Sequence, residues 1–94
     1  MKIAIYIRQY TAENESILQQ LFSLFTPEDQ VYIEQEILSE LQLRSDTFNS
    51  AKSFASFEDL NTSYDVMLTI GGDGTLLKGI TYVRSLQIPI LGIN

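Results

Sequence analysis

The residues best suited to chemistry lie in one short segment, Gly71-Gly72-Asp73-Gly74-Thr75. Three glycines in four residues indicate a tight turn, and at least one of them is expected to have a positive φ. A turn of this kind, between the end of a strand and the start of a helix, points free N–H groups at an anion. The helix dipole adds about half a positive charge at the same place. Phosphate is therefore the expected ligand.

Asp73 is the unusual member of this turn, because a carboxylate close to phosphate is electrostatically unfavourable. A base that accepts a hydroxyl proton during phosphoryl transfer would explain its presence. The alternative is a structural role, in which Asp73 caps the helix by accepting hydrogen bonds from N–H groups of the first turn. Thr75 leaves a similar choice open, between binding phosphate and capping the helix.

Two common phosphate-binding motifs do not account for the turn. A P-loop needs Gly-Lys-Ser/Thr after four spacer residues, and the chain has no such segment. In the dinucleotide pattern G-x-G-x-x-G, Leu77 stands where the third glycine belongs, and no acidic residue follows Asp73. The chain also has no Cys and no His. Any catalysis is therefore expected to use carboxylates, hydroxyls, amines and backbone dipoles.

A strand, a helix and a second strand are expected to position this turn. Asp65–Ile70 is typical of a buried strand, Thr75–Leu86 has the periodicity of an amphipathic helix, and Ile88–Ile93 is another apolar run. The order strand, glycine turn, helix, strand predicts a right-handed βαβ unit within a parallel sheet.

The N-terminal part predicts further elements of the same kind. Lys2–Arg8 is a continuous run of apolar residues between two basic ones and suits a central strand of a parallel sheet. The spacing of apolar residues from Ile17 to Phe25 then indicates an amphipathic helix, with Thr11 as its N-cap and Thr26-Pro27 as its stop.

The middle of the chain is less clearly patterned. Val31–Ile33 could be a second strand followed by a short helix, but a single helix from Glu28 to Arg44 fits the periodicity as well. Residues 46–63, rich in Ser, Asn and Thr, are expected to be loop and short turns. Residues 13–46 hold eight acidic side chains against Arg44 alone, which indicates a solvated acidic face.

Length and composition bound the remaining possibilities. A chain of 94 residues with 45% hydrophobic content is expected to form one globular α/β domain spanning residues 1–94. Its net charge of −6 argues against nucleic-acid and membrane-surface partners. No run approaches the length of a membrane span, so we expect a soluble, cytoplasmic protein.

Residues 65–94 resemble the NAD kinase family, whose hallmark is a GGDGT turn followed by a helix and a Pro-Ile-Leu-Gly-Ile-Asn strand. Lipid kinases of the diacylglycerol-kinase type and phosphofructokinases share the turn. Lys78, which stands where the lipid kinases usually place Glu, and the IPILGIN segment are more similar to the NAD kinases. The resemblance implies a Rossmann-like, three-layer α/β domain with a mainly parallel sheet, the N-terminal domain of such an enzyme.

The resemblance also implies a reaction. Asp73 would accept the proton of the adenosine-ribose 2′-hydroxyl of NAD, and that hydroxyl would take the terminal phosphate of ATP, or of polyphosphate, to give NADP. Mg²⁺ would accompany ATP without protein metal ligands of its own. The implied substrate- and phosphate-binding residues are Gly71, Gly72, Asp73, Gly74, Thr75 and Lys78. Arg8 and Gln9 could add phosphate contacts, although a solvated strand end explains them too, and Asn94 ends the family strand.

Family members carry a second, mostly β domain with an Asn-Asp/Glu motif that this sequence lacks. We therefore expect the chain to be an N-terminal domain that is inactive by itself, and the full-length enzyme to be a homo-oligomer. Two alternatives stay open at this point: the catalytic domain of a lipid kinase, and a non-catalytic nucleotide-binding module.

Overall fold

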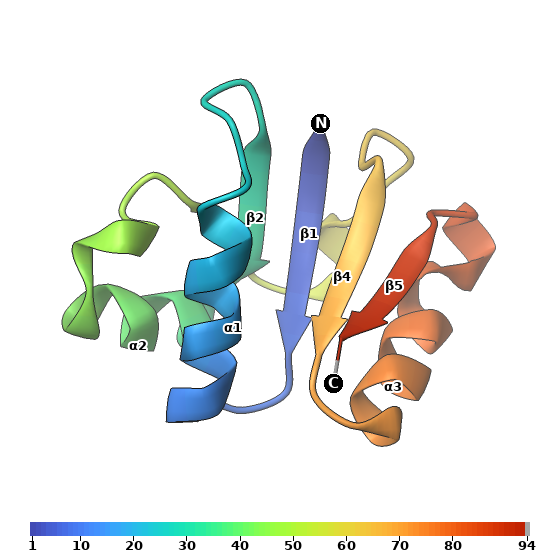
Figure 1. Cartoon of the computed structure of the whole chain (residues 1–94). Coiled ribbons are helices and arrows are strands. Elements are labelled where there is room, and N and C mark those ends of the chain that lie inside the picture. The colour runs from blue at the N-terminus through green and yellow to red at the C-terminus, as the bar shows by residue number, and fades with distance from the viewer. Residues whose placement is uncertain (94) are drawn as a thin grey trace.

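Residues 1–93 are described by a computed structural model, in which five parallel strands form one sheet in the order β3-β2-β1-β4-β5 (Figure 1). The strands are β1 (Lys2–Ile7), β2 (Gln30–Glu34), β3 (Lys52–Phe54), β4 (Val66–Ile70) and β5 (Ile90–Ile93). The helices are α1 (Ala12–Phe22), α2 (Gln35–Arg44) and α3 (Asp73–Val83), and three short 3₁₀ turns are η1 (Asp46–Phe48), η2 (Phe57–Asp59) and η3 (Arg84–Leu86). The predicted α/β class with a parallel sheet is confirmed.

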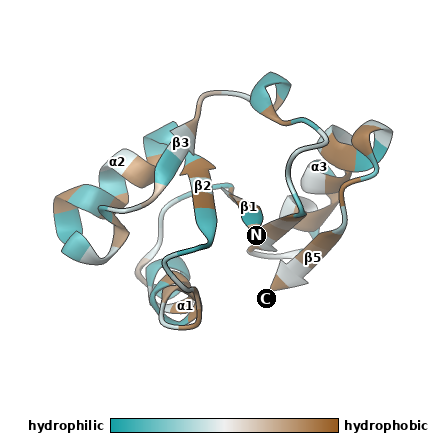
Figure 2. Cartoon of the chain, turned by 90° about the horizontal axis from the view of Figure 1, so that it is seen from above, coloured by the Kyte–Doolittle hydropathy of each residue, from teal (hydrophilic) through white to brown (hydrophobic). Residues whose placement is uncertain are grey.

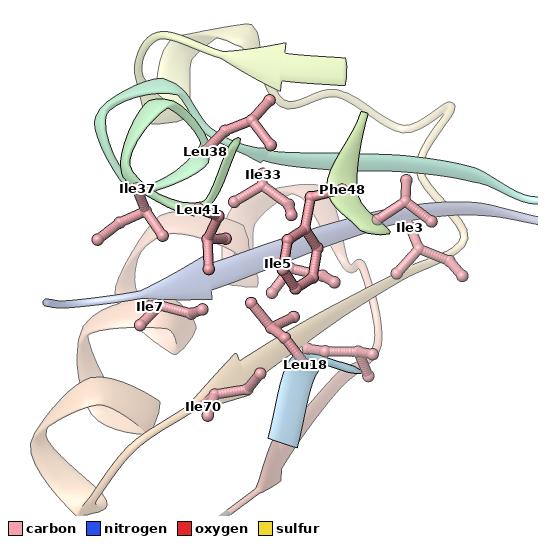
Figure 3. Close-up of a cluster of buried hydrophobic side chains, with 12 residues drawn as sticks. Ile3, Ile5, Ile7, Leu18, Ile33, Ile37, Leu38, Leu41, Phe48 and Ile70 are labelled. Carbon is pink, nitrogen blue, oxygen red and sulfur yellow. The ribbon is translucent and has the colours of Figure 1, made fainter. Parts of the chain in front are cut away.

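The sheet separates two apolar clusters, which makes the domain three layers thick (Figure 2). One cluster joins alternate residues of β1 to Leu18 of α1, to α2 and to Phe48 (Figure 3). The other joins Ala4 and Tyr6, the intervening residues of β1, to Val83 of α3 and to the segment that leads into β4. Side chains alternate between the two faces along a strand, so the unbroken apolar run of β1 supplies both clusters.

The first helix begins where the sequence predicts and ends earlier. The Oγ1 atom of Thr11 accepts a hydrogen bond from the N–H of Asn14 at 3.0 Å, which confirms Thr11 as the N-cap. The helix ends at Phe22 instead of continuing to Thr26-Pro27. A separate turn follows, in which a carboxylate oxygen of Asp29 accepts a hydrogen bond from the N–H of Thr26 at 2.9 Å.

In the middle of the chain, the strand-then-helix interpretation is correct and the single helix from Glu28 to Arg44 is wrong. Glu34 ends β2 and caps α2, since its two carboxylate oxygens accept hydrogen bonds from the N–H groups of Glu36 and Ile37. The prediction of only loop and turns for residues 46–63 is also wrong. This segment contains β3, which pairs with β2 from Tyr32↔Lys52 to Glu34↔Phe54.

The βαβ unit is present with shifted boundaries. Helix α3 begins at Asp73, two residues before the predicted start, and its regular part ends at Val83. A 3₁₀ turn and Gln87, whose φ is +56°, then reverse the chain, so that β5 begins at Ile90 instead of Ile88. In the part of the chain described here, no helix has both the length and the apolar character needed to cross a membrane.

Candidate active site

The sheet has a topological switch point between its two central strands, β1 and β4. Their register pairs Ile3 with Val66 and Ile7 with Ile70, so both strands end at the same edge of the sheet. From there the chain enters α1 on one face and α3 on the other (Figures 1 and 2). In open parallel sheets, the crevice between two such diverging connections is where ligands bind. The β1–α1 and β4–α3 loops border this crevice.

Gly71 is the glycine that the turn requires. Its φ is +143°, and a Cβ built on it would lie 2.7 Å from Oγ1 of Thr75. Its N–H donates a hydrogen bond to the carbonyl of Ile93 on β5 at 3.0 Å, which fixes the end of β4. Gly72, the N-cap of α3, has a φ of −84° and open space where a Cβ would be. The prediction that a glycine of the turn has a positive φ is confirmed at Gly71.

Asp73 is the first residue of α3, and its side chain is exposed. Within residues 1–93 no side-chain hydrogen bond caps this helix, so the interpretation of Asp73 as a helix cap is wrong. Among residues 1–93, the Asp73 carboxylate takes part in no hydrogen bond or ion pair. The carboxylate is therefore free to meet a ligand at the N-terminus of α3.

A cavity of about 360 Å³ lies between the two loops at the switch point. Thr75, only 6% exposed, is one of its lining residues, and its hydroxyl has no hydrogen-bond partner among the described residues. No side-chain nitrogen or oxygen in residues 1–93 is both sealed from solvent and unpaired. The Thr75 hydroxyl is therefore open to this cavity. The full lining is Arg8, Gln9, Thr11, Glu13, Asn14, Ile70, Gly71, Gly72 and Thr75.

The structure brings Arg8 and Gln9 to the same cavity. The Nη1 atom of Arg8 lies 3.8 Å from the position that a Cβ on Gly74 would take. The carbonyl of Gln9 accepts a hydrogen bond from Nδ2 of Asn14 at 3.2 Å, which ties the loop after β1 to the first turn of α1. The structure therefore places the exposed Arg8 guanidinium beside the glycine turn.

A second cavity of about 430 Å³ adjoins the first and shares Gly71 and Gly72 with it. It is lined by Asp73 on one side and by Glu13 of α1 on the other. Sequence reasoning missed Glu13 as a site residue, and its position in the first turn of the helix after β1 is the signal that could have found it. A larger cavity of about 490 Å³ lies elsewhere, at the C-terminal end of α1, against Phe22, Phe25 and Val31.

Two residues predicted for the site, Lys78 and Gly74, line neither of these cavities. Lys78 is exposed on α3 and is not among the residues that line either cavity at the switch point. Asn94 lies outside the described residues. The structure thus gathers Gly71, Gly72, Asp73, Thr75, Arg8 and Gln9, with Gly74 next to the Arg8 guanidinium.

Comparison with known proteins identifies the family. Residues 4–94 match the family described as the ATP-NAD kinase N-terminal domain. The chain belongs to this family. The match covers the glycine turn, Arg8 and Lys78, and it favours the NAD kinase interpretation over the lipid-kinase alternative.

Proteins named NAD kinase are similar to the whole chain. One from Christiangramia forsetii is 41% identical over 95 residues, which cover 100% of this chain and 32% of that protein. One from Flavobacterium johnsoniae is 36% identical over the same share of each. A more distant one, from Methanothermobacter thermautotrophicus, is 53% identical over 38 residues, or 39% of this chain and 13% of that protein. No solved structure gives a significant match.

The chain spans about a third of the length of these relatives. These relatives are therefore about three times as long as this chain.

Proposed function

We propose that the protein containing this chain is an NAD kinase, which transfers the terminal phosphoryl group of ATP or polyphosphate to the adenosine-ribose 2′-hydroxyl of NAD. The observation that carries the proposal is the free carboxylate of Asp73 at the N-terminus of α3, inside a turn whose backbone suits phosphate. A site that only binds phosphate gains nothing from a negative charge there. A site that must accept a hydroxyl proton needs it. Family membership supports the same reaction.

In this proposal Asp73 has the catalytic role, and the other residues of the turn bind phosphate. Asp73 accepts the 2′-hydroxyl proton as the oxygen attacks phosphorus. Gly72 and Gly74 let phosphate oxygens approach the backbone N–H groups, and Gly71 forms the turn through its positive φ. Thr75 offers its open hydroxyl to the cavity. Lys78, one turn beyond Gly74 on the same face of α3, would reach the dinucleotide only where the nucleotide extends past the cavity.

Mg²⁺ is proposed to enter with ATP. Within residues 1–93 no group of three or more His, Cys, Asp or Glu side chains lies together. Mg²⁺ binds readily to phosphate oxygens and keeps several waters, so it needs no ligand cluster from this chain. The bound ion would neutralise charge on the donor phosphates. We also expect the full-length enzyme to be a cytoplasmic homo-oligomer without nucleic-acid or membrane partners.

A chimera tests the proposal: this chain replaces the matching 95 residues of the Christiangramia forsetii relative, and NADP formation from NAD and ATP is measured. We expect the chimera to be active and the 94-residue chain alone to be inactive, because the relatives are about three times as long. Asp73→Asn keeps the shape of the side chain and removes the proton acceptor. It should lower kcat about 10²–10⁴-fold with little change in the KM for ATP.

Asp46→Asn provides the matched control. Asp46 is an exposed aspartate in η1, between α2 and the edge strand β3, so the same change there should leave kcat within about twofold. Near-normal kcat in Asp73→Asn would remove the catalytic assignment and favour a non-catalytic nucleotide-binding module. Robust NADP formation by the 94-residue chain alone would contradict the need for the rest of the protein.

A further inference from the structure

Among residues 1–93, Arg8 has no hydrogen-bond or ion-pair partner for its side chain, although cations are scarce in this chain. The sequence has six Lys and Arg residues and a net charge of −6. Lys2, Arg44 and Lys52 each lie over an aromatic ring, and Arg44 also pairs with Glu40. In the described part of the chain, Arg8 forms neither an ion pair nor a side-chain hydrogen bond. Its guanidinium is therefore available to an external anion.

The backbone places Arg8 firmly beside the glycine turn. Arg8 directly follows β1, whose last residue pairs with the last residue of β4. The Asn14 side chain holds the next carbonyl, that of Gln9. The guanidinium then lies with Nη1 3.8 Å from the Cβ position of Gly74, one residue from Asp73, yet it makes no ion pair with that carboxylate.

The same cavity contains a second side-chain group that has no hydrogen-bond partner in the described part of the chain. The Thr75 hydroxyl, on a residue only 6% exposed, opens toward the cavity that Arg8 lines. Of the described residues that line the two cavities of the switch point, Arg8 is the only one with a cationic side chain, because Lys78 and Arg84 line neither cavity. A planar guanidinium and a hydroxyl facing one cavity suit an anion with several oxygens, such as a phosphate group.

We propose that Arg8 binds the phosphoryl group that is transferred. The inference rests on the proposed function. In that reaction the 2′-oxygen forms a bond to the γ-phosphorus of ATP, the bond from phosphorus to the bridging oxygen breaks, ADP leaves with that electron pair, and the proton passes to Asp73. The transferred group must then lie close to the Asp73 carboxylate. The negative charges of the transferred phosphoryl group and of the Asp73 carboxylate repel each other. Arg8 supplies a positive charge next to the oxygens of the transferred group, which offsets this repulsion.

The first experiment uses the 94-residue chain and inorganic tripolyphosphate, followed by the amide NMR signals of the glycines in the turn. We expect saturable shifts at Gly71, Gly72 and Gly74. Arg8→Ala should weaken binding about 10- to 100-fold, the loss of one charge-assisted pair of hydrogen bonds. Arg84→Ala, at the far end of α3, makes the same change in charge and should stay within about twofold. Equal weakening by both variants would show a general charge effect and overturn the proposal.

The second experiment separates the phosphoryl donor from NAD, which also carries phosphates. In the active chimera, Arg8→Ala should lower kcat/KM for ATP about 100-fold while the KM for NAD changes less than about threefold. Arg8→Lys, which keeps the charge without the planar fork, should recover part of the loss. Thermal melting should be unchanged in each variant, because Arg8 is exposed.

The outcomes distinguish this inference from the proposed function. A rise confined to the KM for NAD would place Arg8 on the dinucleotide and overturn the inference, while leaving the NAD kinase activity intact. Wild-type kinetics in Arg8→Ala would overturn it as well. A chimera without kinase activity whose 94-residue chain still binds tripolyphosphate through Arg8 would contradict the proposed function, and Arg8 would then be only a phosphate-binding residue.

Discussion

Two glycines of α3, Gly79 and Gly74, should respond in opposite ways to the same substitution. Both glycines lie in α3, but their surroundings within the protein differ. A Cβ on Gly79 would lie 2.8 Å from Cγ2 of Thr69 and 3.0 Å from Cδ1 of Ile90. A Cβ on Gly74 would meet only Nη1 of Arg8, at 3.8 Å.

The expected magnitude follows from which neighbour can move. The Ile90 methyl is the flexible end of its side chain, but Thr69 is β-branched, 1% exposed and part of a central strand, so α3 itself must shift away from the sheet. Overpacking of this kind costs about 1–3 kcal/mol, and alanine recovers up to about 1 kcal/mol of helix propensity over glycine. We expect Gly79→Ala to lower the free energy of unfolding by about 1–2 kcal/mol, and Gly74→Ala to raise it by up to about 1 kcal/mol.

Urea denaturation of the 94-residue chain, followed by circular dichroism, measures both changes. With a slope of about 1–3 kcal/mol per molar urea for a small domain, the Gly79→Ala midpoint should fall by about 0.3–2 M. Its thermal midpoint should fall by about 4–8 °C for each kcal/mol lost. Equal midpoints for the two variants, or a more stable Gly79→Ala, would refute the argument that α3 packs on β4 and β5 through the missing Cβ of Gly79.

Two further predictions concern the turn and the N-terminus. Gly71→Ala should lower the free energy of unfolding by about 1–3 kcal/mol, because the φ of +143° disfavours a side chain and a Cβ would meet Thr75. Gly72→Ala should change the free energy of unfolding by less than about 0.5 kcal/mol. Equal urea midpoints for the two variants would contradict this prediction. The N–H of Thr26 and the Met1 ammonium lower the pKa of Asp29. The stability that the Asp29 carboxylate contributes is therefore fully present above its unfolded pKa of about 4. This stability is lost as the pH falls through the folded pKa. The stability difference between wild type and Asp29→Asn should therefore shrink on acidification from pH 7 to pH 2, and a constant difference would contradict the assignment.

The elements with strong local signals could be predicted from sequence, and those that depend on partners could not. Thr11 and the apolar spacing after it predict α1, and the apolar runs predict β1, β4 and β5 to within about two residues. Strand β3 has only three residues in a polar segment, and it exists because β2 offers it a partner. The strand order is also a property of the assembled sheet.

The candidate site likewise contains residues that the sequence identifies and residues that only the folded chain brings together. The glycines and the carboxylate of the turn are contiguous, so local reasoning finds Asp73 and predicts a positive φ. Arg8 and Glu13 lie about sixty residues earlier, and they reach the turn only because β1 pairs with β4 and α1 begins at the same edge of the sheet. Their side-chain types alone do not distinguish them from solvated surface charges. The alternative of a single helix from Glu28 to Arg44 is wrong because the spacing of apolar residues carries no information about strand pairing. In the structure, residues 30–34 form β2, which pairs with β1.

The position of β1 in both apolar clusters has a consequence for cooperativity. Ile3, Ile5 and Ile7 belong to the cluster under α1 and α2, whereas Ala4 and Tyr6 belong to the cluster under α3. If the helices on either face detached, β1 would lose the contacts that its side chains make on that face. The two helical layers are therefore expected to unfold together. The edge strands β3 and β5 each pair with only one neighbouring strand and can fray separately. Amide exchange at the centre of β1 therefore reports the opening of the whole domain.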